Sequence, residues 1–213
     1  YMDLSVESVM ALAAMVIGIL FAKSGVGLGI TFTPVWLVAP ISLAIALGVG
    51  AVVGATNAFF VVRLKMNAFI VTLAAYIWGR GLVVALSGGR SAQELPAELR
   101  FLAIERFLSI PLIAWVSILA TLVFAFILNK TPFGRHLLLV GGNATAAYRA
   151  GIRVDRLTAT TFVLAGAIAG LAGWLLAIRT SGATANLGVG MLFQTFAAVV
   201  IGGVSLKGGV GSL

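Results

Sequence analysis

The sequence has little charge for its length and contains no cysteine. Only 9% of its 213 residues are charged, whereas 61% are hydrophobic. Soluble domains carry about 25% charged residues, so this chain has too few charges to cover a surface that faces water. The lack of cysteine excludes a disulfide framework and a cysteine-based metal site. The composition therefore excludes an ordinary soluble domain and indicates an integral membrane protein.

Acidic residues are rarer than basic ones, with six Asp and Glu against 14 Lys and Arg. The net charge of +8 does not require a nucleic-acid partner, because membrane proteins retain basic residues on the cytoplasmic side. The sequence also shows no cluster of metal ligands and no nucleophile with an adjacent base. We therefore expect no nucleic acid, no metal site and no catalytic residue in this chain.

Long apolar runs occupy most of the sequence. A helix needs about 20 apolar residues to cross ~30 Å of hydrocarbon. Five runs are candidates, at residues 8–23, 35–62, 68–87, 110–128 and 158–178. A shorter apolar run covers residues 191–206. Glycines lie near its end and follow it as far as position 211, which predicts a broken or re-entrant element. We predict an all-α, polytopic transmembrane helical bundle with broken or re-entrant segments, forming a single domain over residues 1–213.

The connectors between these runs differ in charge. Residues 63–67 ("RLKMN") carry two basic residues and no acidic one, and residues 129–157 carry five basic residues against one acidic residue. Residues 88–109 balance three arginines with three glutamates. The positive-inside rule therefore predicts that 63–67 and 129–157 are cytoplasmic and that 88–109 is periplasmic. Within the periplasmic loop, the capping pattern of Ser91 and Glu94 predicts a short amphipathic helix on the outer surface.

The connector 129–157 contains the segment "GGNATAAYRAGI" (141–152), whose pattern predicts a short helix. Asn143 is a good N-cap, the alanines favour a helix, and Gly151 suits the position after its last turn. Small side chains would let a partner approach the helix backbone closely. On composition alone, the same pattern also fits an interfacial helix that merely joins two spans.

Four segments together resemble the permease subunit of bacterial ABC importers of the ribose/xylose/galactose type. They are "DLSVES" (3–8), "NAFIVTLAAYIWGRGLVVALSGG" (67–89), "TPFGRHLLLVGGNATAAYRAGIRVDR" (131–156) and "AAVVIGGVSLKGGVGS" (197–212). They occur in the family's order along nearly the whole chain. The resemblance implies a transmembrane subunit that forms the path of a small solute. A monosaccharide is favoured, while amino acids, nucleosides and signalling sugars stay open.

The resemblance also implies partners and a location. Two permease subunits, identical or different, would enclose the path in the lipid bilayer of the bacterial inner membrane. A periplasmic substrate-binding protein would deliver the solute. ATP would be bound and hydrolysed by a separate cytoplasmic ABC ATPase subunit. This chain contains no Walker A sequence and would need no cofactor of its own. The family has further helices at both ends, so we expect the chain to be a fragment of a longer permease.

The helix at 143–151 matches the family's coupling helix, which docks on the ATPase. The residues implied in ATPase coupling are Gly142, Asn143, Ala146, Ala147, Arg149, Gly151 and Ile152. We expect alternating access, in which closure of the ATPase on ATP moves this helix. That motion would tilt the adjoining spans 110–128 and 158–178.

Polar groups near or within the apolar runs are candidates for the translocation path: Asp3, Ser5, Asn57, Thr72, Arg80 and Gln194. Asp3 would alternatively serve as an N-cap that accepts from the backbone of Ser5. Arg80 lies between two glycines, so it could hold carbonyl oxygens at a helix end or face the path, and we favour the first role. Glu7 stands where the family generally has Gly, and we expect it at the water edge.

An ion- or proton-coupled secondary transporter is the main alternative. Such a transporter would need carboxylates or histidines along a relay inside the membrane. Beyond Asp3 and Glu7 at the start of the chain, no predicted span contains Asp or Glu. The distribution of acidic residues therefore favours the ATP-driven importer.

Overall fold

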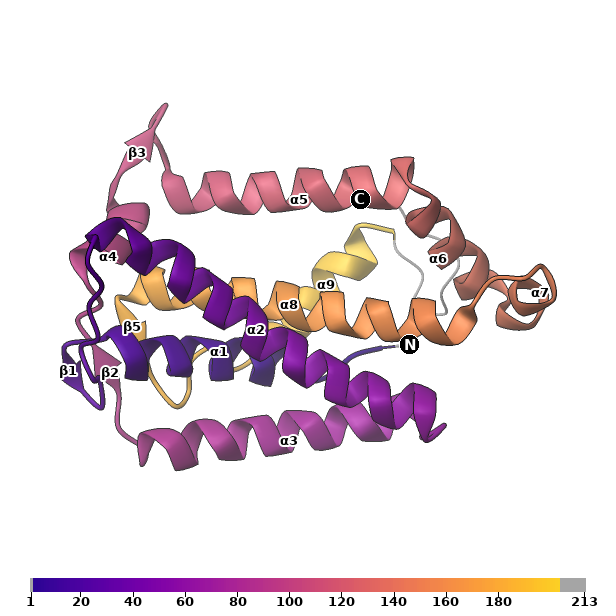
Figure 1. Ribbon diagram of the computed structural model, residues 1–213, viewed down its shortest axis with the longest axis horizontal. Helices are drawn as coiled ribbons and strands as arrows, with labels where there is room; N and C mark the ends of the chain where they lie inside the picture. The colour runs from indigo at the N-terminus through magenta and orange to yellow at the C-terminus, as the bar shows by residue number, and fades with distance from the viewer. Residues whose placement is uncertain (1, 204–213) are drawn as a thin grey trace.

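The structure is a computed structural model that describes residues 2–203, and its architecture is mainly helical (Figure 1). The helices are α1 (Val6–Phe21), α2 (Val38–Ala58), α3 (Ala68–Ser87), α4 (Ala97–Ile104), α5 (Leu112–Lys130), α6 (Pro132–Gly142), α7 (Ala144–Arg149), α8 (Val154–Thr180) and α9 (Met191–Ile201). A 3₁₀ turn (Val35–Leu37) precedes α2, and a π-helical turn (Phe59–Arg63) extends it. The all-α prediction is confirmed.

Four helical segments are long and apolar enough to cross a membrane: Val35–Arg63, Ala68–Ser87, Leu112–Lys130 and Val154–Thr180. They correspond to four of the five predicted spans, and α3 has the predicted bounds. The run predicted at 8–23 forms α1, whose 16 residues cover about 24 Å and fall short of a full crossing. The prediction of a full span there is wrong, because residues 2–4 are not helical and the chain turns into a strand after Phe21.

Short strands gather the connectors at one end of the molecule. Three two-residue strands, β1 (Ser24–Gly25), β2 (Ala92–Gln93) and β5 (Gly182–Ala183), pair antiparallel in the order β1-β2-β5. A second pair, β3 (Arg106–Phe107) and β4 (Ile110–Pro111), forms a hairpin in the same connector as β2. These strands lie at the end of the molecule opposite α7 (Figure 1).

The other end carries the two basic connectors. The Lys65 ammonium lies 2.9 Å from the Asp155 carboxylate, which joins connector 63–67 to connector 129–157. The connector 88–109 lies at the opposite end, with the strands. The predicted division of the connectors between two sides is therefore confirmed, and the assignment of the 63–67 side to the cytoplasm stays a prediction.

Helices α2 and α8 pack backbone against backbone. A Cβ atom on Gly50 would collide with the carbonyl of Gly166, and one on Gly170 would collide with the carbonyl of Ala46. This is the close approach that small residues permit between membrane helices. The Trp174 indole of α8 adds a buried hydrogen bond of 2.8 Å to the Ser42 hydroxyl of α2. The two long helices therefore form one tightly fitted unit.

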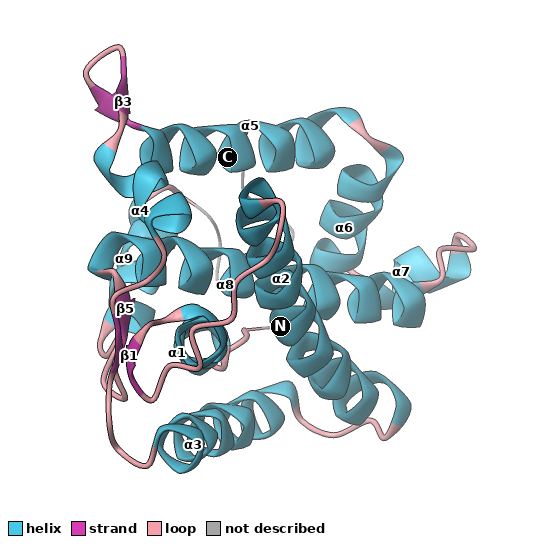
Figure 2. Ribbon diagram, turned by 60° about the vertical axis from the view of Figure 1, so that its left-hand side comes forward, coloured by secondary structure: helices cyan, strands magenta, loops and turns pink. Residues whose placement is uncertain are grey.

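Helix α1 fills the centre of the fold. Figure 2 looks nearly along its axis and shows α2, α3 and α8 around it. Most of its residues are buried, including Met15 and Ile17 at 0% exposure. Gly173 of α8 packs against the backbone of Met10, and Gly79 of α3 packs against Ser8. The core thus consists of α1 enclosed by three long helices.

Helices α5, α6 and α7 form an arm that lies apart from this core (Figure 1). None of the residues of α5 is buried, and large apolar side chains such as Leu119 and Phe126 are more than 60% exposed. This apolar surface suits contact with lipid or with another membrane subunit. Because no residue of α5 is buried, the arm is attached to the core mainly through its two ends.

Two local predictions need correction. The amphipathic helix predicted in connector 88–109 begins at Ala97 after Pro96, so Ser91 and Glu94 do not cap it. Residues 92–93 between them are instead held in the three-stranded sheet. The connector 129–157 contains a second helix, α6, which begins where Thr131 caps it and Pro132 fills its first turn. The element predicted over 202–211 lies largely outside the described residues.

Candidate functional site

The first candidate region is α7, at the far end of the arm. The Asn143 side chain accepts a hydrogen bond of 2.9 Å from the backbone N–H of Ala146, as an N-cap does. Gly151 follows the helix with a φ of +83°, a backbone conformation that favours glycine. The predicted cap, helix and terminating glycine are therefore confirmed. The helix itself covers Ala144–Arg149.

A groove runs between α7 and the end of α6. Its volume is about 420 Å³, and five of the predicted coupling residues line it: Gly142, Asn143, Ala146, Ala147 and Ile152. Leu138 and Leu139 of α6 complete its wall. Arg149 and Gly151 do not line the groove but lie exposed beside it. The predicted coupling residues thus lie in and beside one small, mostly apolar groove with a basic edge, where Ala147 is buried and the other six are exposed or half-buried.

Three of the predicted path residues are joined in a chain of hydrogen bonds. The Asn57 amide of α2 donates to the Ser5 hydroxyl over 2.9 Å, and that hydroxyl donates to the Asp3 carboxylate over 2.6 Å. The backbone N–H of Ser5 donates to the same carboxylate oxygen over 2.9 Å. The predicted acceptance from Ser5 is confirmed, although Ser5 and not Asp3 immediately precedes the helix. The chain fixes the start of α1 to α2.

The other polar candidates lie elsewhere. Thr72 is buried and donates its hydroxyl to the Ala68 carbonyl of its own helix over 2.9 Å. Gln194 is exposed on α9. Neither of them lines the cavity beside Asp3. The structure therefore does not bring the six predicted path residues into one site.

Arg80 forms a buried ion pair with Glu7. The Arg80 guanidinium lies 2.6 Å from the Glu7 carboxylate, whose side chain is only 3% exposed. The guanidinium also donates to the carbonyls of Ala185 and Leu187, at 3.3 and 3.0 Å. The favoured role of holding carbonyl oxygens is thus present, but Arg80 lies within α3 and the carbonyls belong to the segment before α9.

Glu7 connects the same pair to α9. Its second carboxylate oxygen accepts from the backbone N–H groups of Gly190 and Leu192, at 3.1 and 3.0 Å, and Tyr76 donates to its first. A carboxylate at the start of a helix satisfies N–H groups that have no partner within the helix. The expectation that Glu7 lies at the water edge is wrong, because α1 runs through the centre of the fold. Glu7 and Arg80 together tie α1, α3 and α9.

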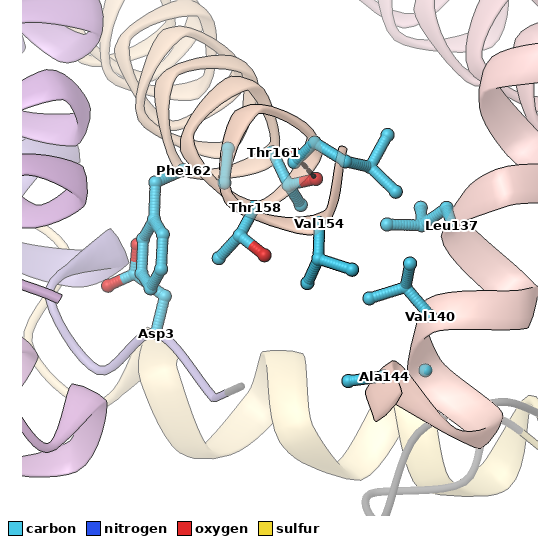
Figure 3. Close-up of a pocket in the computed structure, with 11 residues that line it drawn as sticks. Asp3, Leu137, Val140, Ala144, Val154, Thr158, Thr161 and Phe162 are labelled. Atoms are coloured by element: carbon cyan, nitrogen blue, oxygen red, sulfur yellow. Dashed lines mark hydrogen bonds between the residues drawn. The ribbon is translucent and has the colours of Figure 1, made fainter. Parts of the chain in front are cut away.

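A cavity of about 310 Å³ lies beside Asp3, between α6 and α8 (Figure 3). Asp3 and Phe162 lie on one side, Leu137, Val140 and Ala144 lie on the other, and Thr158 lies between them. Apart from Asp3, none of the predicted path residues pointed to this cavity. It adjoins Ala144, the first residue of α7, so the predicted coupling region lies beside one of the predicted path residues, Asp3. Among residues 2–203, no group of three or more His, Cys, Asp or Glu is placed to hold a metal ion.

The sequence profile of one transport family matches the whole chain. That family is described as "Branched-chain amino acid transport system / permease component", and its profile covers residues 1–213. The chain belongs to this permease family. Together with the four apolar helices, this membership makes it a multi-pass membrane protein.

The permease is similar to sugar and autoinducer permeases. It is 38% identical over 99% of its length to the L-arabinose ABC transporter permease protein AraH of Azospirillum brasilense, and it covers 59% of that protein. It is 35% identical over 99% of its length to the autoinducer 2 import system permease protein LsrC of Yersinia pestis, and it covers 57% of that protein. The AraH protein of Escherichia coli K12 is 36% identical over 74% of the permease, which covers 48% of it. No solved structure matches the chain. The chain thus spans less than two thirds of these curated relatives.

Proposed function

We propose that this permease is part of the transmembrane subunit of an ATP-driven importer for a small solute, and that the solute is a sugar. A cytoplasmic ABC ATPase would supply the energy and bind the ATP. The family membership supports a transport role, and the relatives named for L-arabinose support a sugar. Another relative is named for import of autoinducer 2. The transport role therefore rests on all of these relatives, whereas the sugar rests on the relatives named for L-arabinose.

The surface of α7 is the observation that carries this proposal. The helix is only six residues long, yet both of its ends are fixed, one by the Asn143 cap and the other by Gly151. Its exposed alanines leave the backbone open to a partner, and the groove beside it offers a place for apolar side chains. A short, well-defined element of this kind suits a contact that transmits force.

The arrangement of the helices suggests how motion would travel. Helix α7 continues into α6 and α5 on one side and into α8 on the other. Because α8 is locked to α2, it would move only together with α2. Because α5 has no buried residue, it would tilt with less resistance. Alternating access would then result from movement of the arm against the core.

Other partners follow from the same proposal. A second permease subunit would complete the path, and the exposed apolar face of α5 would contact that subunit or lipid. A periplasmic binding protein would deliver the solute at the end that carries β1, β2 and β5. The proposed location is the bacterial inner membrane.

Cysteine labelling in the intact permease tests the coupling role, because the chain has no native cysteine. Thr145→Cys places a thiol on the exposed face of α7, Met66→Cys places one on the other connector at that end, and Ser109→Cys places one at the opposite end. An impermeant thiol reagent would be applied to intact cells and to inverted vesicles. We expect Thr145→Cys and Met66→Cys to label only in inverted vesicles, and Ser109→Cys only in cells.

The ATPase subunit provides the decisive comparison. Adding it to the inverted vesicles should protect Thr145→Cys from the reagent and leave Met66→Cys reactive. Equal labelling of Thr145→Cys with and without the ATPase would contradict the coupling role. Labelling from the outside would contradict the proposed orientation.

A further inference from the structure

We propose that the cavity bounded by Asp3, α6 and α8 is the inward-facing binding site for the transported solute, a small polyhydroxylated molecule. This inference rests on the proposed function, and it adds the site and the residues that would contact the solute. Its volume of about 310 Å³ is at the lower end of the ~300–1,000 Å³ of small-molecule sites. It lies at the α7 end of the fold, where a solute would leave toward the ATPase side.

The Asp3 carboxylate is held in place and keeps one oxygen available. Both of its hydrogen bonds, from the backbone and the hydroxyl of Ser5, fall on Oδ1. Within the described part of the chain, Oδ2 accepts none. An ionised carboxylate can accept bonds at both oxygens, so Oδ2 can receive the hydroxyls of a solute. Because Ser5 is fixed in turn by Asn57, the acceptor has a defined position.

Thr158 differs from the threonines that follow it on α8. Thr160 and Thr161 donate their hydroxyls to the carbonyls of Arg156 and Leu157 in their own helix, at 2.8 and 2.9 Å. Across residues 2–203, the hydroxyl of Thr158 makes no such bond, and it points into the cavity (Figure 3). A hydroxyl that is both donor and acceptor complements the hydroxyls of a sugar.

The remaining walls are apolar, which suits the carbon face of a sugar. The Phe162 ring lines the side near Asp3, and Leu137 and Val140 line the side formed by α6. Such a site, mostly apolar with a few convergent polar groups, is typical of small-molecule binding. Among the described residues that line the cavity there is one carboxylate and no basic side chain, so an anionic solute is disfavoured.

The two sides of the cavity belong to different parts of the molecule. Asp3 and α8 belong to the core, whereas Val140 and Gly141 end α6 and Ala144 begins α7. Movement of α7 would therefore change the distance between the two walls. The same site would hold the solute in one state of the ATPase and release it in another.

Matched threonine variants of the intact permease, assembled with its ATPase and binding protein in vesicles, test the site. Thr158→Val removes the hydroxyl that points into the cavity, Thr158→Ser keeps it, and Thr160→Val removes a hydroxyl on the same helix that does not line the cavity. Uptake of L-arabinose and of a panel of other pentoses and hexoses would be measured together with ATP hydrolysis. We expect Thr158→Val to lower uptake about three- to tenfold, the worth of one hydrogen bond. Thr158→Ser and Thr160→Val should transport normally.

The outcomes separate the site from the function. If the unmodified complex takes up sugars and Thr158→Val behaves like Thr160→Val, the site is refuted while the importer stands. If the unmodified complex takes up none of the sugars, the proposed substrate class fails, and this site fails with it. Loss of uptake in Thr158→Val that Thr158→Ser restores would support the site.

Discussion

The core and the arm of this permease are built on different principles. In the core helix α8, 44% of the most apolar 18-residue stretch is buried. In the arm helix α5, the corresponding share is 0%. The core helices meet through glycines whose backbones touch. The arm is shaped instead by local features, namely the Thr131 and Asn143 caps and the turn at Gly151.

This difference separates a part that resists deformation from a part that can move. Closely packed helices transmit displacement as a unit, because any shift creates collisions or voids. A helix without buried residues can tilt at small cost in packing. This contrast supports the proposed movement of the arm, which ends at α7, against a core built around α1. The cavity beside Asp3 lies where the two parts meet.

The largest expected effect comes from filling the α2–α8 contact. Gly50→Val would place a branched side chain against the Gly166 backbone. A backbone carbonyl cannot rotate away as a flexible side chain can. Because the Gly166 backbone cannot move aside, we expect the loss in the free energy of unfolding to exceed the ~1–3 kcal/mol that overpacking typically costs, seen as a lower Tm in detergent and as aggregation on gel filtration. Gly48→Val is the control, because a Cβ there meets no atom within 4 Å. Equal stability of the two variants would show that the contact is not close.

The next effect concerns the buried ion pair. Arg80→Gln leaves the Glu7 carboxylate buried without its counter-ion, which costs about 3–5 kcal/mol in comparable buried pairs. Glu7→Gln combined with Arg80→Gln removes both charges and should recover part of that loss. A double variant less stable than Arg80→Gln alone would argue against pairing. Thermal unfolding of the unmodified protein, both single variants and the double variant in the same detergent measures the coupling.

A smaller effect on stability but a complete effect on function is expected in the arm. Gly151→Val forces a branched residue into a positive-φ conformation, at a local cost of about 1–3 kcal/mol. We expect the variant to insert in the membrane normally and to lose ATP-driven uptake. Gly88→Val imposes a similar change at the opposite end and serves as the control, since Gly88 also has positive φ. Normal uptake by Gly151→Val would exclude a coupling role for this turn.

The smallest effect is expected from the exposed ion pair between the connectors. Lys65 and Asp155 are 2.9 Å apart, but each side chain is 67% exposed. Exposed pairs contribute about 0.2–1 kcal/mol, and salt weakens them. Lys65→Ala should therefore shift the Tm only slightly, and the shift should shrink at high salt. A loss as large as that of Arg80→Gln would mean that this pair is shielded from water in the assembled complex.

Local features were predictable from the sequence, and long-range pairings were not. Helix α3 follows from a long, mostly apolar run with Asn67 before it and glycines after it, and α7 follows from its cap and terminating glycine. The partners of Glu7 lie on α3 and α9, more than 60 residues away, and no local periodicity places them there. Asn57, Ser5 and Asp3 were all candidates, but their connection depends on how α2 crosses α1.

One distance comparison tests directly whether the arm moves against the core. Spin labels would be placed at Arg179→Cys, near the end of α8, together with either Thr145→Cys on α7 or Val52→Cys on α2, all of which are exposed. The labelled intact permease would be diluted with unlabelled protein, so that distances within one chain dominate. Pulsed electron resonance would then be recorded with the ATPase in its nucleotide-free and ATP-bound states. We predict that the Thr145–Arg179 distance changes while the Val52–Arg179 distance stays constant. No change in the first distance, or an equal change in both, would contradict a lever moving on a rigid core.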